Sequence, residues 1–91
     1  MAARTQSSNN LDAAVTSATA STVRATGLGA YVGYHVAIVS STVGAENQIV
    51  YVYASADSGN SDDMKVTPPF TVTPTPNDDL SVAKNEANYD A

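Results

Sequence analysis

The residue best suited to chemistry in this sequence is His35, the only histidine of the chain. A histidine can act as a general base beside a serine, or it can ligate a metal. The nearest serine in the local sequence is Ser40, and His35 lies in an apolar stretch that we expect to form a strand. Neither a Gly-x-Ser-x-Gly motif nor a histidine pair at metal-binding spacing is present. We therefore expect a structural histidine that bonds a backbone carbonyl or faces a subunit contact.

An acidic segment, residues 57–63, contains the second pattern that could hold a ligand. Hard cations such as Ca²⁺ prefer clustered oxygen ligands. Here the oxygens could come from Asp57, Asn60, Asp62 and Asp63. The EF-hand spacing fails, because Asp62 stands where that motif requires glycine and Pro68 where it requires glutamate. We expect a solvated acidic loop, and a small calcium- or ligand-binding module is the weaker alternative.

The aromatic residues are the best candidates for packing or partner contacts. Four of the five tyrosines fall in a predicted central hairpin, namely Tyr31, Tyr34, Tyr51 and Tyr53. Tyrosine pairs stabilise sheets across strands, and tyrosines are also favoured anchors at interfaces. The single phenylalanine, Phe70, lies in a proline-rich segment that it could fix to a neighbouring surface. We take these five residues as candidate interface residues and expect no catalytic residue, metal or cofactor.

The tyrosines are positioned by two predicted strands, at about 30–42 and 49–56. Both stretches are uncharged and rich in β-branched and aromatic residues, which is typical of a β-hairpin. Between them, Gly44 and Asn47 tolerate the positive φ that a turn requires. The first stretch is mostly apolar on both faces, as in a strand covered on both sides. A hairpin is only marginally stable alone, so we expect cover from arm segments, from other subunits or from both.

The remaining segments predict a mainly β fold, either a small antiparallel sheet or a sandwich, with extended arms at both ends. Residues 1–10 form a polar N-terminal arm. Residues 11–26 fit a thin helical stripe or a strand, and we favour extended structure. Residues 66–76 contain four prolines and predict an extended thread, an edge strand or an arm. This segment is the last part of a predicted β-rich domain at 11–76. Residues 77–91 are predicted to form an acidic C-terminal tail with at most one or two helical turns.

The composition favours association as a source of stability. The chain is 43% hydrophobic, but it has only 11 Val, 3 Leu, 2 Ile and 1 Phe among 91 residues. That share, about 19%, is near the limit below which a charged chain stays disordered. The absence of cysteine excludes disulfides and thiolate metal sites. Small domains then commonly depend on association.

The charge distribution argues against nucleic acid and membrane partners. The net charge is −5, and the half from residue 46 onward carries eight acids against two lysines. Four scattered basic residues cannot neutralise a run of phosphates. The uncharged stretch 25–45 has an apolar part shorter than a membrane span needs. No apolar region follows Arg4 as a signal peptide requires.

Alanine, threonine, valine and serine dominate a cysteine-free chain with a central hairpin and a Thr-Pro thread at 67–70 and 73–76. In this style the chain resembles the capsid auxiliary proteins (decoration or cement proteins) of tailed phages. The resemblance implies a subunit that docks on a capsid lattice, often as an oligomer, and reinforces it through extended arms. We therefore expect a non-enzymatic structural subunit of a virion, with its own copies, a major shell protein or both as partners. The alternative is a self-polymerising fibre, pilus or surface-layer subunit in an extracellular surface assembly.

Overall fold

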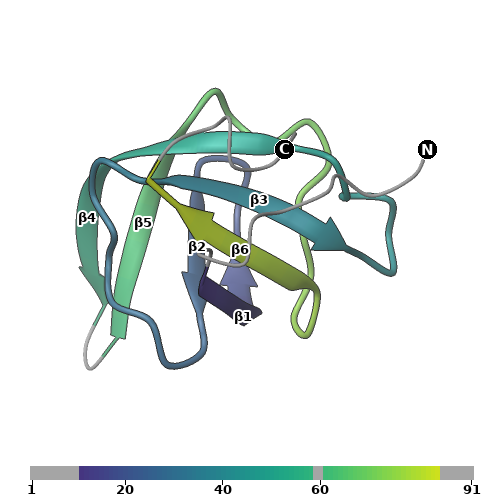
Figure 1. Cartoon of the computed structure of the whole chain (residues 1–91), viewed down its shortest axis with the longest axis horizontal. Helices are drawn as coiled ribbons and strands as arrows, with labels where there is room; N and C mark the ends of the chain where they lie inside the picture. Colours follow the sequence, from purple (N-terminus) through teal and green to yellow (C-terminus); the bar gives the residue numbers. More distant parts are fainter. Residues whose placement is uncertain (1–10, 59–60, 85–91) are drawn as a thin grey trace.

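The computed structural model describes residues 11–58 and 61–84, which form six antiparallel strands and, within these ranges, no helix. The strands are β1 (Leu11–Ala18), β2 (Thr22–Ala25), β3 (His35–Ser40), β4 (Ile49–Ser58), β5 (Ser61–Thr67) and β6 (Asp79–Ala83). They close into a barrel in the order β1-β2-β5-β4-β3-β6, in which β6 returns to lie between β1 and β3 (Figure 1). The predicted mainly β, antiparallel fold is confirmed, and the sheet is closed.

The barrel interior is filled by alternate residues of every strand, because successive side chains of a strand point to opposite faces. Eleven of the buried core residues lie on strands: Val15, Val23, Ala25, Val36, Ile38, Val50, Val52, Met64, Val66, Leu80 and Val82. Ala45 and Phe70 complete this cluster from the connecting loops. The cover that the central hairpin needs on this face therefore comes from other segments of the same chain.

The central hairpin is confirmed, with a shorter first strand than predicted. Strands β3 and β4 pair with Val36 opposite Val50, and Gly44 and Asn47 have φ values of 83° and 71° in the turn. The first strand begins at His35 because Gly33, with φ of 92°, takes a left-handed conformation that ends extended structure before it. Residues 31–34, predicted as part of the strand, lie in a turn.

The acidic segment is not an open loop, which corrects the prediction. Strand β4 continues to Ser58 and pairs with β5, with Asp57 opposite Asp62 and Ser58 opposite Ser61. Residues 11–26 are extended, as favoured, and form the β1–β2 hairpin with a register shift between Val15 and Ser17.

The proline segment and the start of the predicted tail belong to the barrel. Phe70 is 5% exposed and its amide donates to the Ala20 carbonyl over 2.7 Å, so this segment packs on its own chain. Pro74 is fully buried. The prediction of a C-terminal tail from residue 77 is wrong for β6, which pairs with both β1 and β3. The domain thus extends past 76, and the predicted arms at 1–10 and beyond residue 84 lie outside the described residues.

Candidate interaction surfaces

The five aromatic candidates lie in two different environments. Tyr31 and Tyr34 lie in the turn before β3, where their rings meet edge to face at a centroid distance of 5.2 Å and pack against the core. Phe70 is inside that core. Only Tyr51 and Tyr53 are displayed, at 40% and 51% exposure, on the outer face of β4. The structure therefore separates the predicted set into three packing residues and two surface residues.

His35 contacts an aromatic ring and a backbone carbonyl among the described residues. Its ring centroid lies 5.2 Å from that of Tyr51, which is opposite it on β4. Its Nδ1 atom lies 3.4 Å from the Lys84 carbonyl oxygen. These contacts match the structural histidine expected from the sequence and provide no nucleophile for it to activate.

Tyr53 occupies an irregular position in the sheet. In the β4–β5 ladder Val52 pairs with Val66 and Ala54 pairs with Lys65, so Tyr53 is an additional residue in a β-bulge. Bulges change the direction of side chains and are common beside functional sites. Tyr53 lines a hollow of about 380 Å³ together with Ser21, Val66, Thr67 and Pro69. We call this hollow, with the neighbouring exposed Lys65, the tyrosine–lysine surface.

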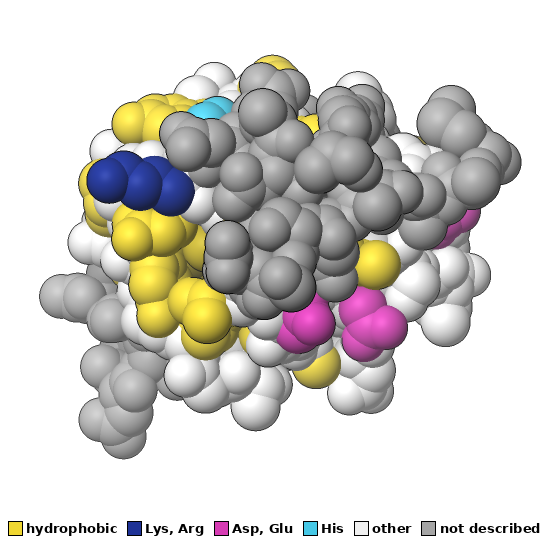
Figure 2. Space-filling model, viewed as in Figure 1, with side chains coloured by type: hydrophobic (Ala, Val, Ile, Leu, Met, Phe, Trp, Pro, Cys, Tyr) yellow, Lys and Arg dark blue, Asp and Glu magenta, His cyan; other side chains and the backbone are white. Residues whose placement is uncertain are grey.

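A second hollow, of about 330 Å³, lies where β6 meets β1 and β3. Its lining consists of Asp12, Ala13, Val39, Asp79 and Leu80. Ala13, Val39 and Leu80 are apolar, and the carboxylates of Asp12 and Asp79 are exposed. Asp79 accepts a hydrogen bond of 2.8 Å from the Ser40 hydroxyl. We call this region the acidic hollow. Figure 2 shows one face of the barrel, on which acidic side chains lie beside hydrophobic ones.

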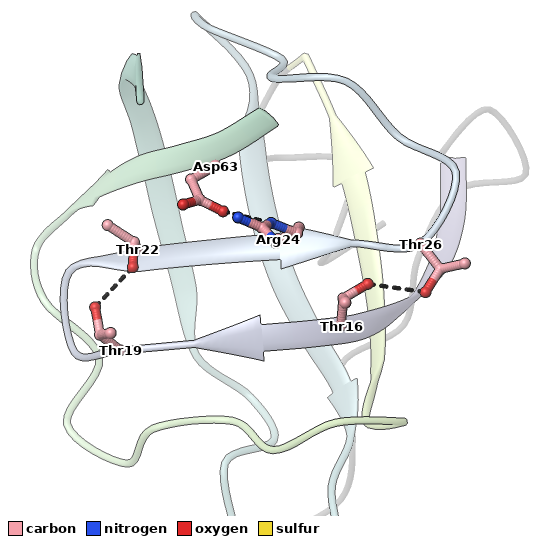
Figure 3. Close-up of polar contacts among 6 residues, drawn as sticks. All are labelled: Thr16, Thr19, Thr22, Arg24, Thr26 and Asp63. Atoms are coloured by element: carbon pink, nitrogen blue, oxygen red, sulfur yellow. Dashed lines mark hydrogen bonds and ion pairs between the residues drawn. The ribbon is translucent and has the colours of Figure 1, made fainter. Parts of the chain in front are cut away.

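One cation near the tyrosine–lysine surface is already paired. The Arg24 Nε donates to the Asp63 Oδ1 over 2.7 Å, linking β2 to β5 (Figure 3). Threonine hydroxyls bond across the β1–β2 hairpin at Thr16–Thr26 and Thr19–Thr22. These contacts occupy side chains on the outer face, so they stabilise the barrel and present no reactive group.

The calcium hypothesis gains no support from the described residues. Asp63 is paired with Arg24, and Asn60 lies outside the described residues. Within the described part of the chain, no group of three or more histidine, cysteine or acidic side chains could hold a metal ion.

Asp78 is a buried carboxylate that the sequence did not single out. It is 3% exposed and accepts hydrogen bonds from the hydroxyls of Ser41 and Thr75 and from the amides of Thr42 and Thr75. Burial raises the pKa of Asp78, but the hydrogen bonds from Thr75, Ser41 and Thr42 outweigh it and leave the pKa below its ordinary value. Asp78 therefore fixes the β3–β4 loop to the turn before β6.

Gln48 is a second polar residue that the sequence did not reveal. Its amide nitrogen donates to the carbonyls of Ala45 and Val72. Its Oε1 accepts hydrogen bonds from the amides of Thr71 and Val72 and from the Thr71 hydroxyl. With this set of bonds Gln48 holds the proline segment against the barrel. Both Gln48 and Asp78 have structural roles.

Among the residues that the structure describes, none forms a helix with the length and hydrophobicity needed to cross a bilayer. Comparison of the chain with protein-family models, with curated proteins and with solved structures found no match. The functional inference below therefore rests on the residues of this chain.

Proposed function

We propose that this chain is a non-enzymatic structural subunit of a larger protein assembly, and more specifically a decoration subunit of a virion shell. The observation that carries the proposal is the outer face of β4, where Tyr51 and Tyr53 are exposed beside an apolar hollow. Tyrosines are enriched at protein interfaces because an apolar ring ends in a polar group. Such a surface fits a protein partner.

The polar groups of the chain support a structural role over catalysis. A catalytic site needs a nucleophile, a base and an electrophile stabiliser that converge on one point. Here His35 packs on Tyr51, Asp78 bonds its own loops, and Asp63 neutralises Arg24. Each of these potentially reactive groups is thus assigned to stabilising the fold.

The virion assignment is supported by the resemblance in composition and style to phage decoration proteins. The proline segment adds no support for a docking arm, because Phe70 and Pro74 are buried in their own barrel. The proposal therefore rests on the outer surface of the barrel. The fibre, pilus or surface-layer subunit is the alternative, and it differs by polymerising without a separate lattice.

Sedimentation velocity and light scattering of the purified chain across concentration test the proposal, with circular dichroism on the same samples. We expect concentration-dependent formation of closed oligomers of folded chains. Open-ended growth into filaments would favour the fibre subunit. A folded monomer at every concentration would contradict the assembly role and would favour a small ligand-binding module.

A further inference from the structure

The tyrosine–lysine surface and the acidic hollow lie on opposite sides of the barrel. Lys65 is on β5 and Asp79 is on β6, and in the closed order β1-β2-β5-β4-β3-β6 these strands are three positions apart in either direction. The two surfaces therefore cannot contact each other within one chain. They can meet only when two chains associate.

The acidic hollow has the chemistry to receive a lysine side chain. The apolar surface that it offers comes mainly from Ala13 and Val39, because Leu80 is only 1% exposed, and this surface suits the methylene stem of a lysine. The exposed carboxylate of Asp79 at the rim suits the ammonium group.

Lys65 is suited to be that lysine. It is exposed on β5, and it has no ion pair among the described residues, where Asp63 is bound to Arg24. Tyr53 is exposed beside Lys65 because of the bulge. Its ring can therefore cover the rim of the acidic hollow of another chain. Each chain thus carries Lys65 and Tyr53 on one side of the barrel and the acidic hollow on the other.

We propose that a second copy of this chain docks its tyrosine–lysine surface on the acidic hollow of the first. The contact joins two different patches, so it is heterologous and repeats head to tail, giving a ring where the rotation closes and a filament where it does not. This inference rests on the proposed assembly function and specifies one contact of it. Chains of net charge −5 repel each other overall, so the local pairing of opposite charges determines how they meet.

Charge reversal tests this contact by sedimentation velocity on the full chain. Lys65→Glu and Asp79→Lys each place like charges in the contact, and we expect each to weaken association by about tenfold or more. An equimolar mixture of the two variants restores association, because each variant retains the surface that the other lacks. The control is Lys84→Glu, which makes the same change in net charge as Lys65→Glu at an exposed site outside both surfaces, and it should leave association close to wild type.

Ionic strength provides an independent readout. Attraction between Lys65 and Asp79 is screened by salt, so association through this contact weakens as salt is added. Repulsion between chains of like net charge alone would give the opposite trend. Circular dichroism melting verifies that the variants fold, and Tyr53→Ala serves as a charge-neutral variant that should also weaken association.

The outcomes separate this inference from the proposed function. If the wild-type chain associates and both charge-reversal variants associate as tightly, the proposed contact is wrong and the assembly role is unaffected. Wild-type chains that remain monomeric at every concentration would overturn both.

Discussion

Replacing Asp78 by asparagine should destabilise the barrel, although the side chain keeps nearly the same shape. The carboxylate has two backbone amide donors, Thr42 on Oδ1 at 3.2 Å and Thr75 on Oδ2 at 2.9 Å. In the variant, one of the two oxygens becomes an amide nitrogen, which cannot accept a hydrogen bond. The hydroxyls of Ser41 and Thr75 can rotate to adapt, but a backbone N–H cannot. Whichever way the asparagine turns, one partly buried N–H, of Thr42 or of Thr75, loses its acceptor.

The loss of one acceptor sets the magnitude. A donor left without a partner costs about 1–3 kcal/mol when it is buried, and a partly buried donor lies at the lower end of that range. Each kcal/mol lowers the melting temperature of a domain of this size by about 4–8 °C. Urea denaturation at neutral pH measures the change in the free energy of unfolding. Asp79→Asn is the matched control, because Asp79 is exposed and the Ser40 hydroxyl that donates to it can bond an amide oxygen instead. We expect that control to change stability by less than about 1 kcal/mol.

The same variant has a signature in its pH dependence. The pKa of Asp78 is lower in the folded chain than its ordinary value of 3.8. The ionised carboxylate therefore stabilises the fold fully above the unfolded pKa, and this contribution is lost as the pH falls through the folded pKa. The difference in stability between wild type and Asp78→Asn should be largest at neutral pH and should shrink in acid. Equal stability of the two proteins, or a difference that does not change with pH, would refute this account of the network.

Two further predictions concern the proline segment. Phe70→Ala should lower the free energy of unfolding by about 3–5 kcal/mol through the cavity it leaves in the core, as measured by urea denaturation; a variant that folds as stably as wild type and loses only association would show instead that Phe70 serves a partner. Gln48→Ala should increase hydrogen exchange at the amides of Thr71 and Val72, which both donate to its Oε1. Because these bonds are exposed, we expect it to lower the free energy of unfolding by about 0.5–1.5 kcal/mol. Unchanged exchange at these amides would contradict its role in holding this segment.

The sequence predicted the parts of the fold that local pattern determines. The β3–β4 hairpin pairs two stretches, 35–40 and 49–56, that are uncharged and rich in β-branched and aromatic residues, with a turn at Gly44 and Asn47, and this pattern is specific. Strand β5 was missed because its core residues Met64 and Val66 alternate with the charged Asp63 and Lys65, which hides the apolar face in the sequence. Strand β6 was missed because it is short and its partners β1 and β3 are far away in the sequence. Such pairings depend on tertiary contacts that no local propensity encodes.

The candidate surfaces were predictable only in part. Sequence pattern placed Tyr51 and Tyr53 on one face, but their exposure depends on which face of β4 the barrel encloses. The direction of Tyr53 depends on a bulge, which is a property of the β4–β5 register. Asn77 and Asp78 after a proline are typical of a turn, and two hydrogen bonds to Asp78 come from the adjacent Thr75. The other two come from Ser41 and Thr42, in a loop more than 30 residues earlier, which no local pattern predicts.

Barrel closure also changes the physical basis for expecting partners. An open central hairpin with two apolar faces, in a chain with few large apolar residues, would need partners to cover it. A closed barrel has only one interior, so two inward residues from most strands fill it. The closed interior therefore supplies, within one chain, the cover that an open hairpin would lack on that face. What remains to be explained is the opposite face, where two tyrosines stay exposed beside a hollow and a lysine without an ion pair among the described residues faces away from an acidic hollow. Association of this chain, where it occurs, is a property of that outer surface, and variants of Tyr53, Lys65 and Asp79 should alter it without unfolding the barrel.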